Sequence, residues 1–123
     1  MSDSLSEAWD FLTQAAAEQD DGCRIPGRSW VPPILEDLVL AARNTSLSRY
    51  YPFTSHARLR FSTGPESWIG NGDDLAVGIA LVPEGRYLVC TQASHDAPVF
   101  VRLETADADE AAAMAEHLVN AGS

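Results

Sequence analysis

The sequence predicts an α+β domain: a four-stranded antiparallel meander with two N-terminal helices and one C-terminal helix. Two observations carry this prediction. Apolar residues recur at helical spacing before residue 55 and alternate with a period of two after it. The strand-like runs are joined by short connections, which favour antiparallel neighbours with helices on one face. At 123 residues the chain fits a single domain spanning 1–123.

The first helix is predicted to begin at Ser4, because Ser4 and Glu7 have the spacing of a capping box. One apolar stripe follows at helical spacing, formed by Leu5, Ala8, Trp9, Leu12, Ala15 and Ala16. The helix is expected to end in the segment EQDDG, where two aspartates precede Gly22.

The second helix is predicted over 33–43, with Pro32 and Pro33 at its opening turn, where a missing N–H costs nothing. Its apolar residues cover a wide arc, so it should be more buried than the first helix. A short helical turn is expected between this helix and Pro52.

Four strands are predicted from alternating apolar and polar residues, over 56–62, 75–82, 86–92 and 99–105. The second of these strands has one face made only of small residues. Pro83 and Gly85 provide turn chemistry between the second and third strands.

The last helix is expected to start at Thr105 or Asp107 and to end at Gly122. Acidic residues crowd its first turn, where the helix dipole favours them. Asp107 and Glu110 have the spacing of a second capping box.

The formal charge of −10 disfavours binding to nucleic acid. All eight basic residues are arginines, so lysine-dependent chemistry is excluded. No secretory signal or membrane-spanning run is visible, which predicts a cytoplasmic protein that does not bind membranes. Cys23 and Cys90 are then expected to be separate thiols, with Cys90 a buried strand residue of raised pKa. We expect no metal and no cofactor.

One candidate polar site centres on His56, at the start of the first predicted strand. His95 could join it if both histidines lie at the same end of the sheet, with Asp73 or Asp74 as a shared acid. The competing interpretation is that His56 bonds to backbone at the turn after Pro52, and that His95 belongs to a polar loop. No catalytic residue is assigned.

A second candidate site is a cationic face of the sheet. Arg58 and Arg60 share one side of the first predicted strand, and Arg102 lies in the fourth. Together they could hold carboxylates by bidentate contacts, with Trp68 taking up partner side chains. The alternative is a solvated face with weak cross-strand ion pairs.

The pattern Pro52, Phe53, Ser55, His56, Leu59 and Phe61 resembles a family of small uncharacterised proteins of high-GC bacteria that are labelled natural-product-biosynthesis-associated. The resemblance covers about residues 33–120, and Trp68 loosely matches the family's tryptophan-bearing segment. It implies a cellular setting, and no catalytic residues are carried over from it. The helix-flanked sheet and acidic charge are also similar in kind to secretion chaperones.

These features favour a non-catalytic binding or accessory module, chaperone-like, for a peptide or enzyme partner in natural-product biosynthesis. A homodimer is expected, since one face of a singly covered sheet stays available for pairing. The alternative is a small enzyme or small-molecule binder that uses His56 with His95 and an aspartate. A structural subunit of a larger complex is a third interpretation.

Overall fold

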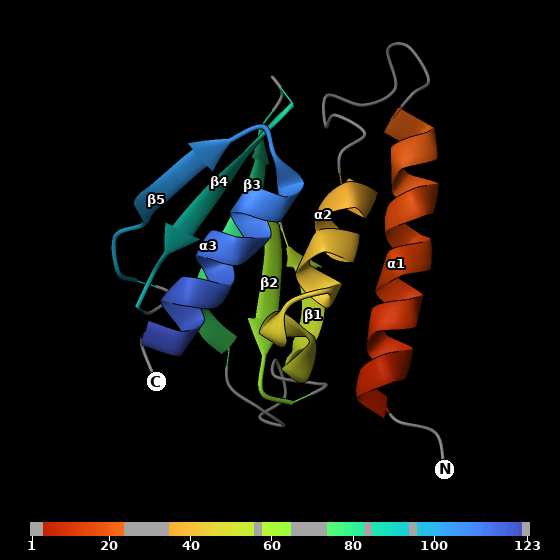
Figure 1. Ribbon diagram of the computed structural model, residues 1–123, viewed down its shortest axis with the longest axis horizontal. Coiled ribbons are helices and arrows are strands. Elements are labelled where there is room, and N and C mark those ends of the chain that lie inside the picture. Colours follow the sequence, from red (N-terminus) through yellow and green to blue (C-terminus); the bar gives the residue numbers. More distant parts are fainter. Residues whose placement is uncertain are drawn as a thin grey trace.

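The computed structural model describes residues 4–23, 35–55, 58–64, 74–82, 85–93 and 96–121. Within them a five-stranded antiparallel sheet runs in the order β1-β2-β3-β4-β5, with all three α-helices against one face (Figure 1). The elements are α1 (Ser4–Cys23), α2 (Leu35–Arg43), the short 3₁₀ helix η1 (Ser46–Arg49), β1 (Tyr51–Ser55), β2 (Arg58–Ser62), β3 (Asp74–Val82), β4 (Arg86–Thr91), β5 (Phe100–Thr105) and α3 (Ala108–Ala121). The predicted α+β class and meander are confirmed.

The predicted number of four strands is wrong, because the sequence does not predict β1 and the sheet has five strands. β1 pairs along its length with β2, Tyr51 opposite Ser62 and Ser55 opposite Arg58. Pro52 lies within it, and a proline is tolerated in a strand at the edge of a sheet. The helical turn expected before Pro52 is present as η1.

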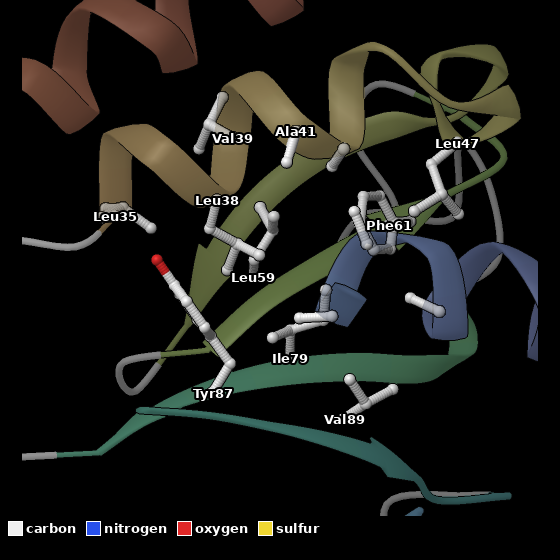
Figure 2. Close-up of a cluster of buried hydrophobic side chains, with 14 of the residues drawn as sticks. Leu35, Leu38, Val39, Ala41, Leu47, Leu59, Phe61, Ile79, Tyr87 and Val89 are labelled. Atoms are coloured by element: carbon white, nitrogen blue, oxygen red, sulfur yellow. The ribbon is translucent and has the colours of Figure 1, made fainter. Parts of the chain in front are cut away.

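The core lies between the helices and the alternate residues of the sheet that face them. Figure 2 shows Leu59, Phe61, Ile79, Tyr87 and Val89 directed at α2 and α3. These five side chains are at most 2% exposed. As predicted, α2 is more buried than α1, and its buried residues are Leu35, Leu38, Val39, Ala41 and Ala42.

Helix α1 begins at Ser4 as expected and ends at Cys23, one residue beyond the predicted acidic segment. Within that segment Asp20 has a tertiary role, because it follows Leu12 and Ala16 on the buried side of α1 at intervals of four residues. Asp20 is only 3% exposed. Its two carboxylate oxygens accept the N–H groups of Leu35 at 3.1 Å and Glu36 at 2.9 Å. A residue of α1 therefore caps α2.

The start of α3 is close to the predicted position. Asp107 Oδ1 accepts the N–H groups of Asp109 at 2.9 Å and Glu110 at 3.4 Å, so Asp107 is the N-cap residue. In a full capping box the side chain of Glu110 would also accept the N–H of Asp107. Here the N–H of Asp107 donates to Thr105 Oγ1 instead. The turn before β4 is confirmed, with Gly85 at a φ of 81°.

Candidate functional site

The face of the sheet opposite the helices, called here the helix-free face, carries Arg58 and Arg60. Both belong to β2, where they alternate with the fully buried Leu59 and Phe61. Because successive side chains of a strand point to opposite sides, both arginines lie away from the helices. The predicted pairing of Arg58 and Arg60 on one face is thus confirmed, and both side chains are half-buried.

Small residues of β3 lie beside these arginines. Arg58 pairs with Ala80 and Arg60 with Gly78 in the antiparallel register. A Cβ placed on Gly78 would be 3.5 Å from Cγ of Arg60, so the aliphatic stem of Arg60 lies across the glycine. The exposed Ala76 continues this row. The centre of the helix-free face therefore consists of small residues, and the cationic side chains of Arg58 and Arg60 lie over it.

The guanidinium group of Arg60 is oriented by two weak contacts. Its Nη2 donates to the carbonyl oxygen of Leu75 at 3.4 Å. Its Cζ lies 5.8 Å from the ring centroid of Phe53 on the neighbouring β1, within the range of a cation–π contact. Neither contact neutralises the charge of Arg60.

Among the residues that the structure describes, neither Arg58 nor Arg60 forms an ion pair with a carboxylate. The described ion pairs are those of Arg43 with Asp10 at 2.6 Å and of Arg86 with Glu104 at 2.7 Å. The Arg86–Glu104 pair is a cross-strand contact of the kind expected for a solvated sheet surface. The alternative of a solvated face with weak cross-strand ion pairs therefore fits the β4–β5 end of the sheet, and it does not account for the arginines of β2.

Arg102 does not lie with the other two arginines. Its Nε donates to Thr91 Oγ1 at 2.9 Å, and its Cζ lies 5.3 Å from the Phe100 ring centroid. Thr91 pairs with Val77 on β3, whose side chain is buried on the helix side. A register shift in the β4–β5 ladder leaves Arg102 as an extra residue in β5. This bulge, which the sequence does not show, turns Arg102 to the helix side.

Cys90 lies on the helix-free face, opposite Gly78. Its thiol is free and 7% exposed. Burial raises the pKa of the Cys90 thiol, and the positive charge of Arg58 partly offsets this rise. The prediction of a buried strand thiol with a raised pKa is confirmed.

The opposite side of the molecule is acidic. A cavity of about 550 Å³ lies between α2 and α3, lined by Asp37, Leu40, Ala41, Asn44, Ala106, Asp107, Ala108 and Asp109. Asp107 is already engaged in capping α3. No group of three or more potential metal ligands gathers anywhere in the described ranges.

The alternative polar site falls mostly outside the described residues. His56, His95 and Asp73 are not among them, and neither is Trp68. Asp74 begins β3, where it pairs with Ser62, but its side chain is not described. The proposed convergence of the two histidines with an aspartate stays a prediction.

Phe53 is the residue of this face that the sequence interpretation missed. The sequence predicts only a short helical turn before Pro52 and a turn after it. The available signal was the aromatic and hydroxyl content around Pro52, which is typical of strands. Phe53 pairs with Arg60 across β1 and β2.

No family model, no curated protein and no solved structure matches this chain. Over the described part of the chain, none of the helices combines the length and the apolar character required to cross a bilayer.

Proposed function

We propose that this chain is a non-catalytic binding module whose helix-free face holds an extended acidic segment of a protein partner. Arg58 and Arg60 bind carboxylates of that segment. The small side chains of Ala76 and Ala80 on β3 leave room for its backbone beside the arginines. The contact is noncovalent and reversible.

One observation carries this proposal: Arg58 and Arg60 share a sheet face without a described carboxylate partner, in a chain with a net charge of −10. In such a chain, acidic groups are abundant for intramolecular pairing. Two adjacent arginines left without an acid therefore favour a carboxylate supplied from outside. Guanidinium groups provide paired, planar donors for this purpose.

Two features of the site favour an extended segment over a single small acid. The two arginines are two residues apart on one strand, a separation of about 6–7 Å. Alternate side chains of an extended peptide have the same spacing. The row formed by Ala76, Gly78 and Ala80 runs alongside on β3, where Ala76 and Ala80 carry only small side chains and the stem of Arg60 covers Gly78.

The wider setting is part of the same proposal. We place the module in the cytoplasm, as an accessory or chaperone-like protein for a peptide or enzyme of natural-product biosynthesis. The support is the sequence resemblance given above and the charge pattern of the sheet. Arginine contacts alone would give modest affinity, because charge-assisted hydrogen bonds contribute about 1.5–3 kcal/mol each and less when exposed.

The proposal is tested with three fluorescein-labelled twelve-residue peptides that share their apolar residues and differ only in net charge, at −4, 0 and +4. Fluorescence anisotropy should show the tightest binding for the acidic peptide and a loss of affinity as salt rises. The double variant Arg58→Glu/Arg60→Glu should weaken that binding at least about tenfold.

A matched pair of single variants controls for overall charge. Arg60→Gln and Arg49→Gln each remove one positive charge, but Arg49 is an exposed residue of η1 and not of the sheet. Only Arg60→Gln should weaken the binding of the acidic peptide. Equal effects of the two variants, or equal affinity for all three peptides, would show that the helix-free face is not the site.

A further inference from the structure

The two edge strands of the sheet, β1 and β5, differ in whether another element covers them. At one edge, β1 contains Pro52, which has no N–H to offer, and α1 lies beside it. The indole N–H of Trp9 on α1 donates to the carbonyl oxygen of Tyr50 at 3.0 Å. This hydrogen bond links α1 to the residue directly before β1. At the other edge, Figure 1 shows β5 as the outer strand, and no helix or strand of the described ranges lies beyond it.

This second edge is apolar and exposed. Phe100 and Val101 at the start of β5 are 53% and 57% exposed, and Val99 directly before the strand is 39% exposed. An uncovered run of this kind on an edge strand is a site for pairing with another strand.

The hydrogen-bond pattern shows which backbone groups of β5 point outward. The N–H of Gln92 donates to Ala76 O at 2.8 Å, so this pair is a hydrogen-bonded pair of the β3–β4 ladder. Bonding alternates along an antiparallel strand, so Val89 and Thr91 direct their backbone groups toward β5. Their partners in β5 are Leu103 and Phe100, whose backbone N–H and C=O groups therefore point toward β4. The backbone groups of Val101 and Glu104 point away from the sheet, and these two residues are called the outward positions.

The spacing of these outward positions is unusual. In a regular strand they would be two residues apart, but the bulge at Arg102 makes Val101 and Glu104 three residues apart. A regular strand cannot pair with both positions. A second β5 in antiparallel orientation can, because its own outward positions have the same spacing.

We propose that two copies of this chain pair through β5, with Val101 of each opposite Glu104 of the other. The two-fold axis then passes between Arg102 and Leu103. The same register brings Phe100 opposite Thr105 of the second copy. Because the β1 edge is closed by Pro52 and α1, pairing ends at two copies and does not continue into a fibre.

The side chains of β5 are compatible with this register. Val101 and Glu104 lie on the helix-free face, as their partners Cys90 and Leu88 do. Glu104 is already paired with Arg86 of its own chain, so it meets a valine without a second acid nearby. Arg102 is drawn toward Phe100 and Thr91 of its own chain, and so away from the two-fold axis.

The pairing through β5 does not depend on the proposed acidic partner. The two interactions can be distinguished because they should respond to salt in opposite directions. Each copy carries a charge of −10, so the copies repel one another at long range. Higher ionic strength screens that repulsion and should strengthen the dimer, whereas it should weaken an acidic peptide bound to arginines.

Sedimentation equilibrium across protein concentration and salt tests the inference. The full chain should be a dimer whose dissociation constant falls as salt rises. Val101→Pro removes an outward N–H, which an edge strand tolerates, and should raise the dissociation constant at least about tenfold. If Val101→Pro fails to fold by circular dichroism, Val101→Glu takes its place, because it sets two acids opposite each other.

Phe11→Ser is the matched control, since Phe11 on α1 is 75% exposed and should leave the dimer intact. Chains carrying Phe100→Cys, mixed with chains carrying Thr105→Cys, should form a 100–105 disulfide that mass spectrometry identifies. A monomer at all concentrations, a dimer that survives both Val101 variants or is lost in Phe11→Ser, or cross-links in another register would each overturn the inference.

Discussion

At the scale of single residues, two buried polar groups show how the helices are fixed to one another and to the sheet. Asp20 of α1 accepts two backbone N–H groups of α2. Tyr87 is 2% exposed beneath α2, with its ring directed toward Leu35 (Figure 2). The sequence marks Asp20 only as a helix-ending signal. Its use as a cap depends on the position of α2, which no local pattern specifies.

The buried hydroxyl of Tyr87 makes a prediction about alkaline pH. Burial, followed by the negative charges of Asp37, Asp20 and Asp107, raises the pKa of Tyr87 well above its ordinary value. The folded protein therefore keeps this proton at pH values where the unfolded chain, with a tyrosine pKa of about 10, has lost it. The free energy of unfolding should fall by up to about 1.4 kcal/mol for each pH unit above 10.

Urea denaturation between pH 8 and pH 12 measures this effect, and the absence of lysine removes ε-ammonium titration from this range. Tyr87→Phe should make the alkaline slope less steep, and part of the slope should remain because burial also raises the pKa of the Cys90 thiol. An identical slope in the Tyr87→Phe variant and the parent protein would contradict the assignment.

At the scale of elements, the sequence predicts those whose apolar spacing is regular over many residues. The three helices and the strands β2 to β5 were expected within a few residues of their observed ends. Strand β1 was not expected, because Pro52 signals a turn and only the edge position makes a proline acceptable there. The bulge in β5 was also invisible, because a register depends on the neighbouring strand.

Two glycines in neighbouring elements should respond differently to the same substitution. Gly85 has a φ of 81°, so Gly85→Ala should lower the free energy of unfolding by about 1 kcal/mol. Gly78 lies in a strand, where an added Cβ meets only ordinary contacts at 3.5 Å with Arg60 Cγ and Leu59 O. Gly78→Ala should be neutral or stabilise the fold by up to about 1 kcal/mol.

Chemical denaturation of the two variants beside the parent protein measures both effects. A loss of stability in Gly78→Ala equal to that in Gly85→Ala would mean that β3 and the arginines of β2 are packed more tightly than the structure shows.

At the scale of the whole molecule, charge is divided between the two layers. The acids with described side chains lie mainly on the helices and around the cavity between α2 and α3. Two arginines without a described acid lie on the opposite face of the sheet. The sequence predicts the alternation that places Arg58 and Arg60 together. It does not predict that Arg102 is turned away, because a single extra residue in β5 decides that orientation.

This division of charge supports the proposal that the helix-free face binds acidic segments. The most direct measurement is a titration of the ¹⁵N-labelled protein with the acidic peptide of charge −4, followed by amide chemical shifts. We expect the largest changes in β2 and β3, around Arg58, Arg60 and Gly78, and little change in α2 and α3. Changes centred on the cavity between α2 and α3, or none at saturating peptide, would contradict the claim.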